Sequence, residues 1–438
     1  MTHLYNQQAI MEQPKKRGII ISLNTDTAEL HDLVYSLDYQ VYKIFTQNRK
    51  KPDGKYYIGK GLLAQLSDFV IENNIELAII NGVLKPSQWF NMEKELGIPI
   101  YDRIRLILDI FADRAQRKEA RLQVRLAQYQ YERPYVKELI HQTRMGEHPG
   151  YMGGGEYPVD DYYEMIKKQI RRIKEDLQKI SQDRKTRRRT RRNSGFYLVS
   201  ITGYTNVGKS SLLNVLTGEK VIVEERLFST LSTTTRRIQK YNGKTLPILL
   251  TDTVGFIQDL PHWLIQSFHA TLEEIALADV IILVVDLSED LNIIQEKMRV
   301  SLQELQEIGS SATIIMALNK SDLLPTWEVK NRMHQLRKKG ALGQYISVPI
   351  SVDTGKNIAQ LVSVIHTSLP SPTRMHITLP GYSLHQAFIS WLHDKAWIET
   401  VHYTNDVDIT IGCHPAMVSE VISKSICLGG KTQILQCK

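Results

Sequence analysis

Five short motifs lie in one order between residues 203 and 357, and their side chains suit the binding of a nucleotide. In chain order they are GYTNVGKS at 203–210, a Thr-rich run at 230–235, DTVG at 252–255, NKSD at 319–322 and SVDTGKN at 351–357. The first has the GxxxxGK[ST] pattern, whose backbone N–H groups surround phosphates at a helix N-terminus. Lys209 would reach the β- and γ-phosphates, and Ser210 would be a magnesium ligand. Alone, this motif predicts phosphate binding, and some such matches are plain glycine-rich turns.

The NKSD motif would give specificity for guanine. The carboxylate of Asp322 can accept hydrogen bonds from both N1–H and the N2 amino group of guanine, whereas adenine offers no matching pair of donors. Asn319 would bridge this loop to the phosphate loop, and the stem of Lys320 would lie along the base. Ser351 would add a backbone contact to the guanine carbonyl. An exposed polar turn is the alternative, which the shared sheet edge of the two loops disfavours.

The DTVG motif and the Thr-rich run would complete a magnesium and γ-phosphate site. Asp252 would hold magnesium through water, and the N–H of Gly255 would sense the γ-phosphate, so the segment that follows is a candidate switch. One threonine should bind magnesium only with GTP; Thr230 is the first choice, and Thr234 and Thr235 are the alternatives. A plain solvated turn is the other interpretation of this run.

These motifs give one set of predicted site residues. The predicted catalytic residues are Lys209, Thr230 and Gly255, and the predicted magnesium ligands are Ser210, Thr230 and Asp252. The predicted nucleotide-binding residues are Gly203, Tyr204, Thr205, Asn206, Val207, Gly208, Lys209, Ser210, Ser211, Asp252, Gly255, Asn319, Lys320, Asp322, Ser351 and Val352. The predicted ligands are therefore GTP or GDP with Mg²⁺.

Phe256 follows DTVG, at the position where many pockets of this kind carry a glutamine that orients the attacking water. An apolar ring cannot orient water. Intrinsic hydrolysis should therefore be slow, and a partner, a reshaped loop or a second cation must accelerate it. Asn206 is a candidate ligand for K⁺, which could take the charge role of an arginine finger. A turn-stabilising asparagine is an equally good interpretation.

Alternating strand and helix patterns place these motifs at one edge of a sheet. Apolar runs end at the motifs: FYLVSIT at 196–202, LPILLTD at 246–252 and TIIMALN at 313–319. Such runs before phosphate and base loops predict an α/β P-loop domain over residues 195–370, with helices on both faces of a mostly parallel sheet.

The segments on either side predict three smaller parts and a short tail. Residues 18–103 alternate strand and helix and predict a small parallel α/β unit, after a flexible N-terminus at 1–17. Residues 373–438 follow a β-α-β-β-α-β pattern, which predicts a ferredoxin-like domain. Residues 104–194 predict a long antiparallel helical hairpin with a Gly-rich tip at 146–158 and a basic linker.

The hairpin would consist of one uninterrupted helix from Ile104 to Tyr131 and a second at 160–190. Apolar residues in the second helix step by four and three, which is the seam of a two-helix coil. This seam is formed by Ile166, Ile170, Ile173, Leu177 and Ile180, and the residues expected to face it are Leu122, Leu126 and Tyr129.

Composition limits the class of protein. The 438 residues are 42% hydrophobic, which is ordinary for globular domains, and no apolar run is long enough to span a bilayer. The first 17 residues are polar and mixed, so we expect no secretory signal, and three cysteines without CxxC spacing suit reduced thiols. We therefore expect a monomeric cytoplasmic protein with no membrane partner.

Positive charge is concentrated in one stripe. The segment from Lys167 to Arg192 contains thirteen Lys or Arg residues and three acidic residues, so its net charge is +10. Because the whole chain has a net charge of +8, the rest of the chain sums to −2. Such a stripe can be a solvated helix face or a linker, but it also attracts phosphate backbones. We predict an RNA contact here. The candidate residues are Arg171, Arg172, Arg187, Arg188 and Arg189.

The chain resembles the HflX family of translation-related GTPases nearly end to end. The resemblance is carried by DTVGFIQDLPHWLIQSFHATLEE at 252–274, GYTNVGKSSLLN, LFSTLSTTTRR, YYIGKG and the run that begins YDRIRLILDIFADRAQRKEARL at 101. It implies a GTPase that binds the large ribosomal subunit through ribosomal RNA, responds to the ribosome, and splits or rescues stalled ribosomes. The alternative is an RNA chaperone or assembly scaffold in which GTP occupancy is a switch and turnover is incidental. The least favoured of the three hypotheses is recruitment of the protein to an acidic membrane surface.

Overall fold

The structure is a computed structural model of the whole chain. It describes residues 16–25, 27–37, 39–115, 117–146, 156–192, 195–218, 234–238, 248–253, 255, 263–264, 275–381, 386–404 and 406–435. The chain divides into two compact units, residues 1–175 and 176–438. The finer division into five segments stays a prediction.

The first unit begins with a small parallel α/β fold, as predicted. Its four strands run in the order β2-β1-β3-β4, and every neighbouring pair is parallel. Both faces of β1 are covered, so Ile19, Ile20 and Ile21 are all fully buried. The elements are β1 Arg17–Ser22, α1 Ala28–Ser36, β2 Gln40–Thr46, α2 Lys60–Asn73, β3 Leu77–Ile80, α3 Pro86–Leu96 and β4 Ile100–Asp102.

The predicted single helix at 104–131 is wrong, because the chain forms two helices there. α4 spans Arg103–Arg114 and α5 spans Lys118–Gly146. Between them Ala115 has φ −73° and ψ 94°, which is an extended conformation. No Gly or Pro marks this break. Its cause is tertiary: α5 packs against both α4 and α3, which requires the chain to turn back after α4.

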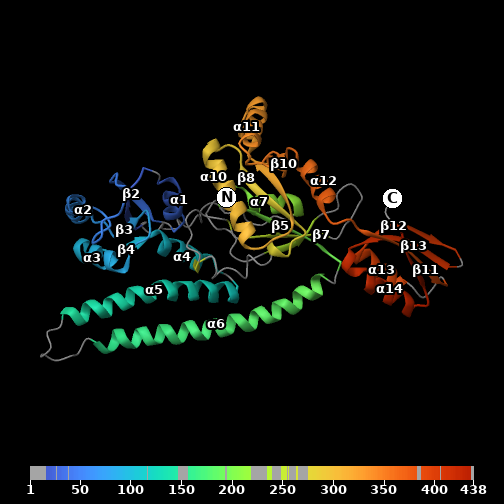
Figure 1. Cartoon of the computed structure of the whole chain (residues 1–438), viewed down its shortest axis with the longest axis horizontal. Helices are drawn as coiled ribbons and strands as arrows, with labels where there is room; N and C mark the ends of the chain where they lie inside the picture. Colours follow the sequence, from blue (N-terminus) through green and yellow to red (C-terminus); the bar gives the residue numbers. More distant parts are fainter. Residues whose placement is uncertain are drawn as a thin grey trace, which may run out of the picture. The chain divides into compact units, whose positions relative to one another are not determined.

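A second long helix, α6, spans Glu156–Arg192 and covers the predicted helix at 160–190. Its seam residues Ile166, Ile170 and Ile173 are buried. In the first unit, α5 and the start of α6 lie side by side and antiparallel (Figure 1), and the hydroxyl of Tyr162 donates to Glu132 Oε2 at 3.2 Å. Most of the predicted Gly-rich tip at 146–158 lies outside the described residues.

The second unit contains a six-stranded sheet in the order β10-β9-β8-β5-β7-β6, which is parallel except for β6. This is the predicted P-loop α/β fold, and its central strand β8 is buried along its whole length. The elements are β5 Tyr197–Gly203, α7 Lys209–Thr217, β6 Thr234–Arg237, β7 Ile248–Asp252, β8 Val280–Asp286, α10 Leu291–Glu307, β9 Thr313–Asn319, η1 Ser321–Leu323, α11 Thr326–Lys338, β10 Ile346–Pro349 and α12 Ile358–Ser368.

The C-terminal part of the second unit has the β-α-β-β-α-β order predicted from the sequence. Its antiparallel strands run β12-β13-β11-β14, so the first strand lies between the third and the fourth, as in ferredoxin-like folds. The elements are β11 Thr373–Pro380, α13 Gln386–Lys395, β12 Trp397–Tyr403, β13 Asp406–Cys413, η2 Pro415–Met417, α14 Val418–Cys427 and β14 Lys431–Leu435. No helix in the described part of the chain is long and apolar enough to cross a membrane.

Candidate nucleotide-binding site

The loop between β5 and α7 is a turn that two glycines make possible. Gly203 has φ 142°, and a Cβ there would lie 2.3 Å from the carbonyl oxygen of Val284 on β8. Gly208 has φ 94°, and a Cβ there would lie 2.4 Å from Nδ2 of Asn319. Any larger residue would push the loop away from the sheet. The loop backbone therefore stays close to the sheet edge, at the N-terminus of α7, where phosphates bind well.

Lys209 is a buried cation at the start of α7. It is 8% exposed, and its Nζ donates to the carbonyl oxygen of Tyr204 at 2.5 Å. Burial lowers the pKa of Lys209 to about 8, against a smaller opposing effect of Asp252. Gly255 lies beside this ammonium group, since a Cβ on it would approach Nζ to 2.6 Å. The predicted catalytic lysine and the predicted γ-phosphate sensor are thus neighbours.

Ser210 and Asp252 are also brought together. Ser210 Oγ donates to Asp252 Oδ2 at 3.0 Å, and the N–H of Thr253 donates to the other oxygen at 2.9 Å. A hydroxyl beside a carboxylate suits the hard oxygen coordination of Mg²⁺, which keeps waters and phosphate oxygens as its other ligands. Within the described residues, no cluster of three or more His, Cys, Asp or Glu could hold a metal alone. The residues fit a magnesium ion bound together with phosphates.

Asn319 connects the loops that surround the predicted base pocket. Its Nδ2 donates to the carbonyl of Val207 in the phosphate loop at 2.8 Å, and its Oδ1 accepts from the N–H of Val352 at 3.1 Å. Asn319 is 3% exposed. The Asn319 side chain therefore connects the phosphate loop to the 351–357 loop. The hydrogen bond to the phosphate loop is the one that the NKSD motif predicted.

The residues on either side of this bridge have different surroundings. Asp322 is exposed in η1, and its carboxylate has no hydrogen bond or ion pair with another described residue, so it is available to a ligand. Ser351 is fully buried, and its Oγ accepts from the N–H of Thr354 at 3.1 Å. Lys320 has a left-handed backbone (φ 59°), and its Nζ lies 2.6 Å from Asp286 Oδ2.

Asp286 is the residue that sequence reasoning missed. It ends β8 and is 6% exposed, and it also accepts from the N–H and the hydroxyl of Ser288 at 2.9 and 2.6 Å. Its ion pair with the Lys320 ammonium group positions the side-chain stem of Lys320, which would lie along the base. Its position in the sequence could have indicated it, because Asp286 ends an apolar strand as Asp252 does.

The remaining predicted site residues are placed unevenly. Tyr204, Thr205 and Val207 are buried in the phosphate loop, Asn206 is exposed with φ 62°, and Ser211 is half-buried on α7. Thr230 and Phe256 lie outside the described residues, as does the side chain of Thr234. Thr235 lies on β6, with its hydroxyl 3.4 Å from that of Thr251.

The basic residues singled out for RNA lie on α6. Arg171 and Arg172 are exposed, and Arg171 forms an ion pair with Glu175 at 3.2 Å. Arg187, Arg188 and Arg189 have helical backbones, and their side chains lie outside the described part. The structure thus places two of the five candidates on a solvent-facing surface.

Known proteins show a consistent similarity to this chain. A family model described as "GTP-binding GTPase N-terminal" matches residues 24–112, "GTP-binding GTPase Middle Region" matches 114–191, and "50S ribosome-binding GTPase" matches 198–320. "GTPase HflX" of Thermococcus kodakarensis is 38% identical over 90% of both chains. The chain belongs to the HflX family of GTPases. The relative from Methanocaldococcus jannaschii is 42% identical over 75% of this chain and 79% of its own.

Membership in the HflX family establishes the activity of the chain as binding and hydrolysis of GTP. A solved structure described as the complex of SsGBP and GDP is 29% identical over 80% of this chain and 98% of its own, with a TM-score of 0.48.

Proposed function

We propose that this HflX-family GTPase binds the large ribosomal subunit and uses GTP binding and hydrolysis to time its association and release, so that stalled ribosomes can be split or rescued. One observation carries the proposal: the family model that matches residues 198–320 is described as a 50S ribosome-binding GTPase. GTP can shift such an equilibrium only if the GTP- and GDP-bound states differ in affinity for the subunit.

Within the nucleotide site, we propose one role for each described group. The 203–210 loop and Lys209 hold the phosphates, Ser210 and Asp252 hold Mg²⁺, and Asp322 reads guanine. Thr230 stays the proposed GTP-dependent magnesium ligand. Bound magnesium would neutralise phosphate charge during hydrolysis. The geometry supports these roles, because the buried Lys209 ammonium group and the hydrogen-bonded pair of Ser210 and Asp252 both lie where the phosphate loop enters α7.

We propose that α6 contributes the RNA contact. Arg171 and Arg172 are exposed on a helix whose segment from 167 to 192 carries +10. Guanidinium groups bind phosphate oxygens in a bidentate manner, and each phosphate contact releases counterions. A single-sign charge density of this kind favours ribosomal RNA over an uncharged partner.

Co-sedimentation with purified large subunits and measurement of phosphate release test the proposal. A non-hydrolysable GTP analogue should promote sedimentation, and subunits should stimulate hydrolysis. The double variant Arg171→Glu/Arg172→Glu should lose both effects while its GDP affinity stays unchanged, because these residues lie outside the nucleotide motifs. The matched control is Lys50→Glu/Lys51→Glu, which makes the same charge change at two exposed positions. Absence of both stimulation and nucleotide-dependent sedimentation would refute the proposal.

Two further arms of the same assay separate finer alternatives. An Asp252→Asn variant that binds GTP, does not hydrolyse it and keeps its effect on ribosomes would point to a scaffold with incidental turnover. Hydrolysis in K⁺ compared with Na⁺, in wild type and Asn206→Ala, tests the proposed potassium ligand. A K⁺ preference that disappears in Asn206→Ala supports it, and equal rates in both salts argue against it.

A further inference from the structure

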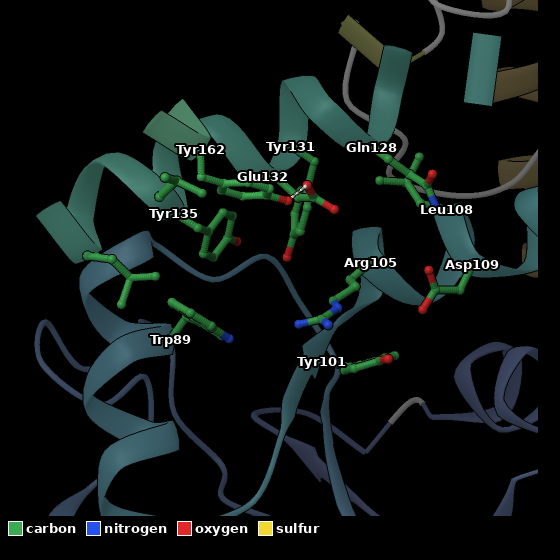
Figure 2. Close-up of a pocket in the computed structure, with 12 residues that line it drawn as sticks. Trp89, Tyr101, Arg105, Leu108, Asp109, Gln128, Tyr131, Glu132, Tyr135 and Tyr162 are labelled. Atoms are coloured by element: carbon green, nitrogen blue, oxygen red, sulfur yellow. Dashed lines mark hydrogen bonds between the residues drawn. The ribbon is translucent and has the colours of Figure 1, made fainter. Parts of the chain in front are cut away.

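A cavity of about 300 Å³ lies in the first unit, apart from the nucleotide motifs (Figure 2). Its walls come from α3, β4, α4, α5 and the start of α6. Its volume is at the lower end of the range for small-molecule sites, which are typically apolar clefts with a few well-placed polar groups. A cavity of this volume can enclose a ligand smaller than a complete nucleotide.

One end of the cavity is aromatic and apolar. Figure 2 shows Trp89, Tyr135 and Tyr162 on this side, and we call these three residues the aromatic end. The rings of Trp89 and Tyr135 meet edge to face, with centroids 5.3 Å apart. Val136 and Leu139 also line the cavity. This end suits an apolar group of a ligand.

A buried carboxylate holds the tyrosines of the cavity in place. Asp102 is 1% exposed and accepts from the hydroxyl of Tyr131 at 2.9 Å, and the hydroxyl of Tyr135 lies between Asp102 Oδ2 at 3.5 Å and its nearer acceptor, the carbonyl oxygen of Leu84, at 3.2 Å. It also accepts from the N–H of Arg105 at 2.9 Å and so caps α4. Burial raises the pKa of Asp102. Its hydrogen bonds fix the ring positions, so the cavity wall is pre-organised.

The other end of the cavity carries opposite charges side by side. Arg105 and Asp109 are four residues apart on α4 and therefore lie on one face of the helix. Arg105 lies over the Tyr101 ring, 4.2 Å from its centroid, and its guanidinium forms no hydrogen bond or salt bridge with a described residue. Asp109 is close enough to interact with Arg105 electrostatically, and burial raises the pKa of Asp109. Figure 2 shows Arg105 between the aromatic end and Asp109.

We propose that this cavity binds a small zwitterion of the α-amino acid type. Its carboxylate would accept from Arg105, its ammonium group would donate to Asp109, and its apolar side chain would pack on the aromatic end. An α-amino acid carries its ammonium and carboxylate groups on the same carbon atom, which matches two opposite charges on one helix face. Each charge would thereby receive a charge-assisted hydrogen bond, the strongest kind that such a pocket offers.

Ligands of other charge fit this lining less well. With Arg105, Asp109 and Glu132, the ionisable side chains of the lining sum to −1, which disfavours a polyanion such as a nucleoside triphosphate. Glu132 already accepts from Tyr162. Asp109 interacts with Arg105 and Tyr101, whereas a simple cation or a neutral molecule would bury the Arg105 guanidinium without a hydrogen-bond acceptor, which is costly. A zwitterion satisfies both charges at once.

Calorimetric titration of the full-length chain tests the proposal with L-phenylalanine and L-leucine as probes. At least one should bind saturably, and its affinity should fall at least about tenfold when the carboxylate is replaced (the amide) or the amine is blocked (the N-acetyl form). Because a ligand of the folded state stabilises it, the same probe should raise the unfolding temperature of the first unit.

Three variants make the test specific. Arg105→Gln and Asp109→Asn should each weaken binding at least about tenfold, whereas Arg117→Gln removes the same charge from an exposed position outside the lining and should change nothing. Circular dichroism and the unfolding temperature of the first unit, measured in every variant without probe, report that this unit is folded, and GDP affinity reports the same for the second unit. The proposal is overturned if folded wild type binds neither probe, if the amide binds as well as the acid, or if Arg105→Gln binds like wild type.

Discussion

Lys209 is a cation buried without a full counter-charge, and this makes nucleotide affinity depend on pH. Burial lowers the pKa of Lys209 to about 8 in the free protein. Phosphate oxygens favour the charged form and raise the pKa in the bound state, so binding takes up a proton above pH 8. Affinity should be constant below the free pKa and fall as pH rises through it.

Calorimetry in buffers of different ionisation enthalpy measures this proton uptake. At about pH 8.5, GDP binding should take up between half a proton and one proton, and near pH 7 much less, since Lys209 is then already charged. Uptake that does not change between these two pH values would mean that Lys209 is not the phosphate-binding group.

Asp322 should decide which purine binds, because its exposed carboxylate can only accept hydrogen bonds. In Asp322→Asn the amide presents a donor to a position that guanine fills with its own amino donor. Affinity for GDP should fall at least about 100-fold, whereas xanthosine diphosphate, which has a carbonyl there, should bind better than to wild type. Competition binding with both nucleotides measures the switch. Asn331→Asp, an exposed exchange on α11, is the control. An unchanged preference for guanine would remove Asp322 from the site.

Individual contacts of this site were predictable where they depend on a local motif. The position of Asn319 between two loops follows from NKSD coming after a strand at the edge that carries the phosphate loop. The ion pair between Lys320 and Asp286 was not predictable in this way. The ion pair forms because β8 and β9 are neighbouring strands in which Asp286 pairs with Asn319, the residue before Lys320. The sequences of the two strands do not reveal that they are neighbours in the sheet.

At the scale of elements, the close approach of β5 to β8 depends on Gly203. A Cβ at this position would lie 2.3 Å from the Val284 carbonyl, and φ 142° is strained for any other residue. Gly203→Ala should therefore destabilise the region by about 3 kcal/mol or more, from strain and overpacking together. Hydrogen exchange of β5 and α7 peptides in the full chain measures the effect, since a multidomain protein has no single unfolding transition.

Gly309 is a matched control for Gly203. It also has a positive φ, 75°, but a Cβ there meets nothing within 4 Å. Gly309→Ala should cost only the strain of a left-handed alanine, about 1–2 kcal/mol, and should leave exchange in β5 and α7 unchanged. Equal protection of β5 in wild type and Gly203→Ala would contradict the steric argument.

Helix boundaries show where prediction from sequence fails. The heptad spacing of Ile166, Ile170 and Ile173 correctly predicted one long helix. The same reasoning joined α4 to α5, because Ala115 has good helix propensity and no Gly or Pro is near. The break comes from packing of α5 on α3 and α4, and such long-range contacts leave no mark in local propensity.

At the scale of the whole molecule, charge separates into one basic segment and a nearly neutral remainder. Residues 167–192 carry +10, and the rest sums to about −2. A field from one segment steers polyanions to that segment, since the Debye length at physiological salt is about 8 Å. Binding to RNA should therefore depend on α6 far more than on the other basic residues scattered along the chain.

The salt dependence of RNA binding tests this asymmetry. Each phosphate contact with a single strand contributes about −0.7 to the slope of log K against log salt concentration. Arg171→Ala/Arg172→Ala should make the slope for a large-subunit RNA fragment less steep by about 1.4, because two exposed guanidinium groups are lost. Lys50→Ala/Lys51→Ala removes the same charge outside the segment and should leave the slope unchanged. If the two double variants changed the slope equally, RNA would be responding to net charge, and α6 would have no special part in binding it.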